Sequence, residues 1–272
     1  MTTFERRYRL LNLLREQPGI RVPDIARLLD VSEGTIRNDL KAMAESGQLT
    51  RVWGGGIPVE EERGVSPAYT ARARMNQSAK RCIARIASQL VEDGDSLLLD
   101  ASTTVFHMAG FLQERQNLTI ITNGIEAGRE LARNPSNTII LLGGILRPDG
   151  TAITRPSNEY LLHDLHIKTA FMSSSGFSIE SGLTEVDLNE AQFKRSMVAS
   201  ARKLVALIDS SKFGQVNLTS YARTNQVDHI FTDCDLPDEW KIKLENAGVA
   251  YTLCSEAIET GNLKPIETDS AT

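Results

Sequence analysis

Seven polar side chains between residues 32 and 51 carry the hydrogen-bonding groups that read double-stranded DNA. Arginine pairs with guanine and asparagine with adenine through two parallel hydrogen bonds, while hydroxyl and ammonium groups contact phosphates or base edges. We predict that these side chains contact DNA: Ser32, Glu33, Thr35, Arg37, Asn38, Lys41 and Arg51. For any one of them alone, the alternative is a solvated helix face.

Three short helices and a hairpin are predicted to position these groups. The first helix spans about residues 4–17, and the second begins near Pro23, which a first helical turn tolerates. The buried face of the second helix is expected to consist of Ile25, Leu28 and Leu29. Ser32 is a favourable N-cap for the third helix. The inward residues of that helix are predicted to be Ile36, Leu40 and Met43, and a glycine-rich hairpin at 49–57 follows. This order is typical of a winged helix-turn-helix.

Four later segments, each after a predicted buried strand, are rich in hydroxyl, amide and glycine residues. Hydroxyls and free backbone N–H groups at a helix N-terminus bind phosphate, and glycine allows a ligand to approach the backbone. We predict a small-molecule site from Asp100, Ser102, Thr103, Thr104, Thr122, Asn123, Gly143, Gly144, Ser174 and Gly176. Turns and helix caps use the same residue types, which is the alternative for each segment taken singly.

Four charged residues extend this prediction. Glu190 and Lys194 are spaced i, i+4 on one predicted helix, where the alternative is a surface ion pair. Asp209 and Lys212 flank two serines at a strand end, where the alternative is a local cap or ion pair. In the functional interpretation, Lys212 donates to a phosphate or substrate oxygen, and Glu190 and Asp209 accept from sugar hydroxyls.

The elements that would hold this site alternate along the chain. Strands are predicted at 96–100, 118–122, 138–142, 168–173, 203–209, 229–232 and 249–253. Helices are predicted at about 69–91, 104–115, 124–133, 189–201 and 238–247. This alternation is typical of a doubly wound parallel sheet, in which ligands bind at the carboxyl ends of the strands.

The residues quoted so far resemble the DeoR family of bacterial regulators. In the head, the family pattern is matched by Val31, Ser32, Thr35, Ile36, Arg37, Asp39, Leu40, Gly47, Arg51, Gly54 and Gly55. In the second domain, the matching segments are 99–104, Thr122-Asn123, Gly143-Gly144, Glu190-Ala191 with Lys194-Arg195, and 209–213. The resemblance implies a sensor with a fold similar to ribose-5-phosphate isomerase and a phosphorylated sugar or sugar alcohol as effector.

The chain departs from the family pattern at two of these positions. Asn38 stands where the family usually has a second arginine, which affects the operator sequence that is read. Ser102 replaces the glycine of the first sensor loop, which either narrows the approach of the phosphate or adds a hydroxyl contact. The identity of the effector therefore does not follow from the resemblance.

Length and charge support two domains and an assembly. The chain has 272 residues and a formal net charge of −5. Residues 1–57 contain nine basic and seven acidic residues, a net charge of +2, which leaves −7 for the rest. A single DNA-binding head with so few basic residues is expected to bind DNA phosphates weakly. We therefore expect a homo-oligomer, a dimer or tetramer, that places paired heads on DNA.

The remaining composition argues against several other classes of protein. The chain has no apolar run long enough to span a bilayer and no basic-then-apolar leader, and its three cysteines form no disulfide or metal pattern. We expect a cytoplasmic protein without a cofactor or metal. The predicted domains are a DNA-binding domain (1–57), a linker (58–68), an α/β effector-sensing and oligomerisation domain (69–258) and a disordered tail (259–272).

These observations predict a DNA-binding transcriptional regulator. The resemblance implies a repressor of a sugar or sugar-alcohol catabolic operon that a phosphorylated sugar releases, and activation stays open. One alternative is a sugar-phosphate isomerase-like enzyme with a DNA-binding head. Another is a constitutive DNA binder whose second domain serves only to oligomerise.

Overall fold

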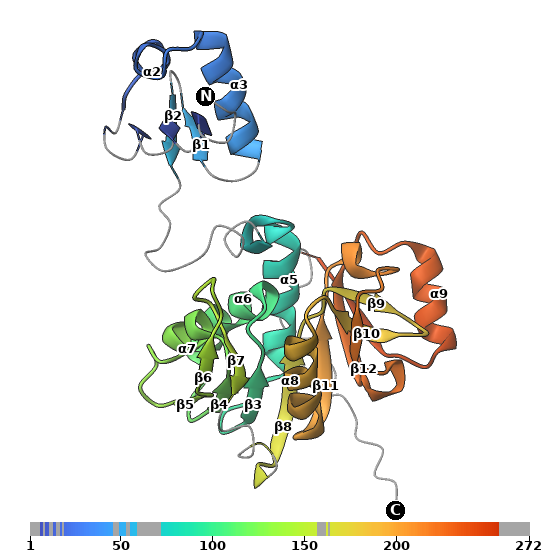
Figure 1. Ribbon diagram of the computed structural model, residues 1–272. Coiled ribbons are helices and arrows are strands. Elements are labelled where there is room, and N and C mark those ends of the chain that lie inside the picture. Colours follow the sequence, from blue (N-terminus) through green and yellow to red (C-terminus); the bar gives the residue numbers. More distant parts are fainter. Residues whose placement is uncertain are drawn as a thin grey trace, which may run out of the picture. The chain divides into compact units, whose positions relative to one another are not determined.

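The computed structural model describes residues 6–7, 9–10, 13–14, 17, 19–45, 49–52, 55–58, 72–156, 162 and 164–255. The chain divides into two compact units, Met1–Met75 and Asn76–Thr272, and each is described by itself (Figure 1). Of the predicted linker only residue 58 is described, and the predicted tail 259–272 lies outside the described residues.

The first unit contains a helix-turn-helix followed by a hairpin. Helix α2 is Val22–Leu29 and helix α3 is Glu33–Glu45, while β1 (Leu49–Val52) pairs antiparallel with β2 (Gly55–Pro58). The described residues of the predicted first helix at 6–7, 9–10 and 13–14 are helical. A common apolar core contains Leu10, Leu14, Val22, Ile25, Ala26, Leu29, Ile36, Leu40, Met43 and Leu49.

The predicted buried position of Leu28 is wrong, because its side chain is 58% exposed. The apolar stripe of α2 repeats at i, i+3, i+4 and i+7 from Val22, which selects Ile25, Ala26 and Leu29. Leu28 lies about 100° around the helix from Leu29 and therefore outside that stripe.

The second unit is built on a seven-stranded sheet in the order β14-β13-β11-β8-β3-β4-β5. All neighbouring strands in it are parallel. In chain order the strands are β3 (Ser96–Leu99), β4 (Thr119–Thr122), β5 (Thr138–Leu141), β8 (Ile167–Met172), β11 (Ala201–Leu207), β13 (His229–Asp233) and β14 (Tyr251–Cys254). Each overlaps a strand predicted from the sequence, which confirms the doubly wound α/β class. Figure 1 shows β3, β8 and β11 side by side.

Helices cover both faces of this sheet. They are α5 (Gln77–Ala87), α6 (Thr103–Phe111), α7 (Ile125–Leu131), α8 (Leu188–Ala199) and α9 (Asp238–Asn246). Alternate residues of the strands enter two separate cores, as the period of a strand requires. Leu97 and Leu99 pack in the core that contains residues of α5 and α6, whereas Leu98 packs in the core that contains residues of α8.

Two smaller antiparallel pieces were not predicted. The hairpin of β6 (Gly144–Leu146) and β7 (Ile153–Pro156) follows β5. A three-stranded sheet in the order β12-β10-β9 consists of β9 (Gly176–Ser178), β10 (Gly182–Glu185) and β12 (Thr219–Ala222). These strands have three or four residues, too few to show a hydrophobic period in the sequence.

Candidate functional site

The N-terminus of helix α3 is fixed by a side-chain cap. The Ser32 hydroxyl accepts the backbone N–H of Thr35 at 3.1 Å and lies 2.9 Å from the Thr35 hydroxyl. On the buried face of α3, Asp39 accepts hydrogen bonds from Arg6 (2.5 Å) and Arg7 (2.9 Å). Burial opposes ionisation, but the two arginines hold the pKa of Asp39 below its usual value. The helix is therefore anchored to the first described residues of the chain.

The opposite face of α3 presents the predicted DNA contacts to solvent. Arg37, Asn38 and Lys41 are exposed, and the Arg37 guanidinium pairs with Glu33 one turn earlier at 2.8 Å. An exposed pair of this kind contributes at most about 1 kcal/mol, so DNA can displace Glu33 from Arg37 at little cost. Arg51 lies on strand β1 of the hairpin.

In the second unit, the predicted site residues follow neighbouring strands at one edge of the sheet. Parallel strands end at the same edge, and the strand order β11-β8-β3-β4-β5 places their following loops side by side. The first polar residues of the loops after β11, β8, β3 and β4 are Asp209, Ser173, Asp100 and Asn123, and the loop after β5 contains Gly143. This is the edge at which ligands bind in doubly wound sheets.

Asp100 organises the loop between β3 and α6. Its carboxylate accepts the N–H of Ser102 (3.0 Å) and the N–H of Ser173 (2.9 Å), and it is 1% exposed. The Ser102 hydroxyl caps α6 by accepting the N–H of Val105 at 3.2 Å. Thr103 and Thr104 form the first turn of α6, where backbone N–H groups have no acceptor in the preceding turn. The predicted phosphate cradle is thus a capped helix N-terminus.

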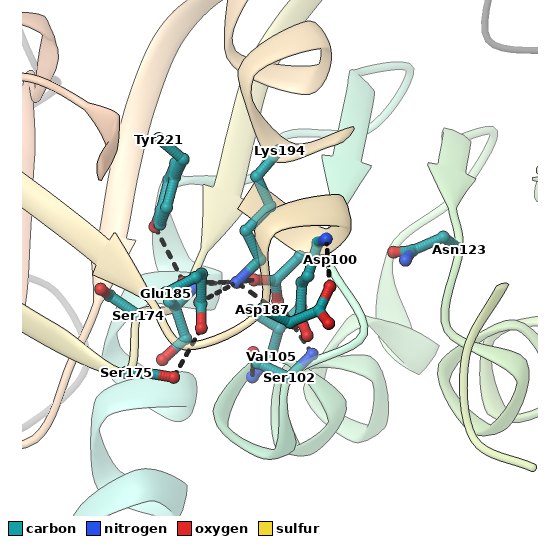
Figure 2. Close-up of polar contacts among 12 residues, drawn as sticks. Asp100, Ser102, Val105, Asn123, Ser174, Ser175, Glu185, Asp187, Lys194 and Tyr221 are labelled. Atoms are coloured by element: carbon teal, nitrogen blue, oxygen red, sulfur yellow. Dashed lines mark hydrogen bonds and ion pairs between the residues drawn. The ribbon is translucent and has the colours of Figure 1, made fainter. Parts of the chain in front are cut away.

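Lys194 lies buried between two carboxylates (Figure 2). Its ammonium group is 2.9 Å from Asp100 and 2.7 Å from Glu185, and it donates to the Ser173 carbonyl at 2.8 Å. Tyr221 donates its hydroxyl to the same carbonyl at 2.8 Å. Burial favours the neutral amine, but the charges of Asp100 and Glu185 raise the pKa of Lys194 well above its ordinary value.

The alternative of a surface ion pair between Glu190 and Lys194 is correct in its pairing but wrong in its location, because Lys194 is buried. Their distance is 3.8 Å, longer than the distances from Lys194 to Asp100 and Glu185, and Lys194 is 5% exposed. Sequence reasoning missed Glu185, which ends β10 and also accepts the Ser175 hydroxyl at 2.5 Å. No sequence signal identified it, because its strand was not predicted.

Glu190 faces a second missed residue, Arg147, on the loop of the β6–β7 hairpin. The Arg147 guanidinium is 3.4 Å from Glu190 and 2.7 Å from Asp149. Burial raises the pKa of Glu190, while the charges of Lys194 and Arg147 oppose that shift. A basic residue four positions after Gly143 was visible in the sequence, but the hairpin that places it against α8 was not.

The loop after β4 is joined to this hairpin. The Thr122 hydroxyl accepts the N–H of Gly124 at 3.0 Å, and the Asn123 amide donates to the Ile153 carbonyl at 3.0 Å. Backbone bonds from Ile153 to Asn123 (2.9 Å) and from Ile125 to Thr151 (3.0 Å) complete the junction. A cavity of about 10 Å³ lies here, lined by Asn123, Arg147, Ala152, Ile153, Thr154, Glu190, Phe193 and Lys194.

Of four other predicted effector residues, Ser174 and Gly176 are closely packed, whereas Gly143 and Gly144 are exposed. The Ser174 hydroxyl lies within hydrogen-bonding distance of backbone groups of Gly176 and Thr184. A Cβ on Gly176 would collide with the Gln215 carbonyl, so packing alone explains this glycine. Gly143 and Gly144 are exposed, and a Cβ on Gly143 would meet no neighbouring atom within 4 Å.

The loop after β11 contacts the start of the second unit. Asp209 is 1% exposed and accepts the side-chain amide of Asn76 at 2.9 Å, the N–H of Ser211 at 3.2 Å, and the Ser211 hydroxyl. Asn76 precedes α5, has a left-handed φ of 54°, and does not cap its own helix. Lys212 is partly exposed in the same loop. Asp209 therefore links a predicted effector loop to the first residue of the unit.

The described residues contain neither a metal-binding cluster nor a membrane-spanning helix. Within them, no group of three or more His, Cys, Asp or Glu side chains is arranged to hold a metal ion. No helix among the described segments is both long and apolar enough to cross a membrane.

Two family models match the chain. The DeoR-like helix-turn-helix domain matches residues 6–62, and the DeoR C terminal sensor domain matches residues 75–234. The second match covers more than half of the sequence. The chain belongs to the DeoR family.

Relatives of this DeoR-family chain match it over nearly its whole length. The HTH-type transcriptional regulator GolR of Listeria innocua is 34% identical over 92% of this chain and 98% of its own. A putative aga operon transcriptional repressor of Escherichia coli O157:H7 is 29% identical, covering 93% and 95%. Among solved structures, ribose 5 phosphate isomerase A from Neisseria gonorrhoeae is 12% identical with a TM-score of 0.37, covering 49% of this chain and 52% of that one.

The DeoR-family match decides between a regulator and an enzyme. The chain combines a DNA-binding helix-turn-helix domain with the sensor domain of this family, and the relatives that match it end to end are transcriptional regulators. The protein is therefore a DNA-binding transcriptional regulator and not an enzyme.

Proposed function

We propose that this regulator represses a sugar or sugar-alcohol catabolic operon and that a phosphorylated sugar or sugar alcohol releases it from DNA. Repression is supported by the relative described as a putative repressor of the aga operon. We place its action in the cytoplasm, where its DNA target lies.

DNA recognition is assigned to the exposed face of α3. Arg37 and Asn38 contact base edges, while Ser32, Thr35, Lys41 and Arg51 contact phosphates or base edges. The exposure of Arg37 and the anchoring of α3 through Asp39 support this assignment, since a reading helix must be held firmly by its inner face. Glu33 holds Arg37 in the free protein.

The effector is assigned to the strand-end edge, and the observation that carries this assignment is the capped N-terminus of α6 beside Asp100. Phosphate binds the free N–H groups and hydroxyls of Thr103 and Thr104, supported by the positive end of the helix dipole. The carboxylate of Glu190 accepts hydrogen bonds from sugar hydroxyls, and Asp100 holds the loop before α6 in place. Lys212 approaches the phosphate from the β11 loop.

Release requires that the effector bind one state of the protein better than another. Asn76 supplies the coupling, because it is the residue at which the chain enters the sensor unit and it is hydrogen-bonded to Asp209. An effector that engages the β11 loop changes this bond, and the change passes to the residues that precede Asn76. The paired heads then lose the spacing that matches their half-sites.

This mechanism requires a homo-oligomer, at least a dimer. One head offers few cations to DNA, and two linked heads bind paired half-sites far more tightly than one. Light scattering coupled to gel filtration is expected to give at least two chains per particle. A strictly monomeric regulator at micromolar concentration would contradict paired binding.

The phosphate assignment is tested by a double variant, Thr103→Ala with Thr104→Ala. This variant is expected to bind operator as the wild type does and to resist release by sugar phosphates, because it lacks two hydroxyl contacts to phosphate. Competition for labelled operator DNA measures both properties. Equal release of variant and wild type would show that the phosphate binds elsewhere.

A further inference from the structure

The ammonium group of Lys194 is already engaged by the protein itself, because it donates hydrogen bonds to Glu185 and the Ser173 carbonyl and forms an ion pair with Asp100. An ammonium group has three N–H donors. Three acceptors surround it at 2.7–2.9 Å, namely Glu185, the Ser173 carbonyl and Asp100. Lys194 therefore holds the two carboxylates in place, and we look for ligand contacts among the other residues that line the cavity beside it.

Asn123 has an acceptor that no described residue uses. Asn123 is 7% exposed, and its Nδ2 donates to the Ile153 carbonyl. Its Oδ1 is buried and has no hydrogen-bond partner. Figure 2 shows this amide facing the cluster around Lys194. Buried acceptors are rarely left unpaired, so an unpaired one that lines a cavity points to a ligand donor.

Arg147 lines the same cavity. Its side chain is 22% exposed, its guanidinium carries five N–H donors, and the bonds to Glu190 and Asp149 use its two terminal nitrogens. The 3.4 Å bond to Glu190 is longer than the 2.7 Å bond to Asp149. Arg147 thus has donors to spare, and its contact with Glu190 is the weaker of the two.

We propose that Asn123, Arg147 and Glu190 form a subsite for two neighbouring hydroxyl groups of the effector, with Arg147 as the residue that determines specificity. The first hydroxyl donates to Asn123 Oδ1 and accepts from the Arg147 guanidinium. The second hydroxyl donates to Glu190. This inference rests on the proposed function, because the same effector places its phosphate at the N-terminus of α6.

The cavity is too small for a sugar hydroxyl group unless the contact between Arg147 and Glu190 opens. A volume of about 10 Å³ holds about one water molecule, too little for a carbon bearing a hydroxyl group. The hydroxyls therefore enter as Arg147 moves away from Glu190 while keeping Asp149. Arg147 and Glu190 then lose their hydrogen bond to each other, and each gains one to a hydroxyl group of the ligand. Only a ligand with correctly spaced hydroxyl groups therefore offsets the free energy that separating Arg147 from Glu190 costs.

The test uses the full-length protein and isothermal titration with two kinds of probe. The first is a panel of pentose, hexose and hexitol phosphates, and the second is inorganic phosphate. Arg147→Lys keeps the positive charge but removes the guanidinium fork, and Asn123→Ala removes the unpaired acceptor. Arg133→Lys, an exposed arginine paired with Glu130 on the same domain, is the matched control.

Arg147→Lys and Asn123→Ala are each expected to weaken the best sugar phosphate at least tenfold while the affinity for inorganic phosphate stays within twofold. Arg133→Lys should match the wild type with both probes. If Asn123→Ala does not fold, Arg147→Lys decides the question alone.

Three outcomes would overturn the subsite. If both variants bind sugar phosphates as the wild type does, the subsite is wrong while the proposed function stands. If Arg147→Lys weakens inorganic phosphate equally, Arg147 binds the phosphate and not hydroxyls. If the wild type binds no member of the panel, the proposed function fails together with the subsite.

Discussion

The partners of Lys194 lie outside its own helix. Helical spacing in the sequence pairs Lys194 with Glu190, yet the fold brings Asp100 from the loop after β3 and Glu185 from β10 closer. A sequence shows which residues share a helix face, but not which strand ends meet that face. Arg147 was missed for the same reason, because its position depends on the β6–β7 hairpin. By contrast, Ser32 was correctly predicted as an N-cap, since capping is a local interaction.

Replacing Lys194 by methionine is expected to lower the free energy of unfolding of the sensor unit by about 3–5 kcal/mol, because two buried carboxylates lose their counter-ion. Urea unfolding followed by Trp240 fluorescence measures the change. The matched control is Lys168→Met, since Lys168 is 45% exposed and pairs with Asp95 and Glu92. That variant should lose at most about 1 kcal/mol. Equal losses for the two variants would contradict a stabilising buried cluster.

Replacing Arg37 by alanine is expected to weaken specific operator binding by about 1–3 kcal/mol, or about 5- to 150-fold, if Arg37 reads a base. Fluorescence anisotropy with a labelled operator duplex measures the affinity. Arg133→Ala removes a similarly exposed arginine that pairs with a glutamate three residues earlier, and it should leave binding unchanged. An unaltered affinity for Arg37→Ala would remove Arg37 from the interface.

At the scale of elements, the parallel sheet was predictable and the antiparallel additions were not. The seven parallel strands are continuous apolar runs because helices bury both of their faces, and such runs stand out in a sequence. Strands β6, β7, β9, β10 and β12 are short and contain Gly, Ser and Thr, as loops do. These additions supply Glu185 and, through β7, Ile153 and Thr154 of the cavity lining, and none of these strands was predicted from the sequence.

Asn76→Gly tests the coupling between the β11 loop and the start of the sensor unit. Glycine adopts the left-handed backbone of Asn76 without strain, while the hydrogen bonds to Asp209 (2.9 Å) and Ser211 (3.4 Å) are lost. The variant is expected to bind operator and sugar phosphates within threefold of the wild type, yet to remain mostly on DNA at saturating effector.

The control for this variant is Asn117→Gly. Asn117 has the same left-handed backbone (φ 58°) but precedes β4, at the sheet edge opposite the site. It should respond to effector as the wild type does. If Asn76→Gly also responds normally, the coupling does not pass through Asn76.

At the scale of the whole molecule, stability is expected to depend on the protonation of His229. This side chain lies at the start of β13 beside Thr252 (2.8 Å), and burial lowers its pKa from 6.5 to about 4. Between those two values the unfolded chain binds more protons than the folded chain, so stability falls as the pH drops through this window. The slope is at most about 1.4 kcal/mol per pH unit for one proton.

His229→Gln removes this titration and can keep a hydrogen bond to Thr252. Urea unfolding at pH 7 and pH 5 is expected to show a larger loss of stability for the wild type than for the variant. Identical losses would place the acid sensitivity in other groups.

At the scale of the whole molecule, our central proposal is that helix α3 of the first unit binds DNA and that an effector bound at the strand-end loops of the second unit causes its release. The most direct measurement is anisotropy of a labelled duplex from upstream of the protein's own gene, at moderate ionic strength, with and without the panel of sugar phosphates. The account predicts tighter binding to this duplex than to a scrambled one. It also predicts release by a phosphorylated sugar but not by the same sugar without its phosphate. Equal binding to both duplexes, with and without every member of the panel, would contradict it.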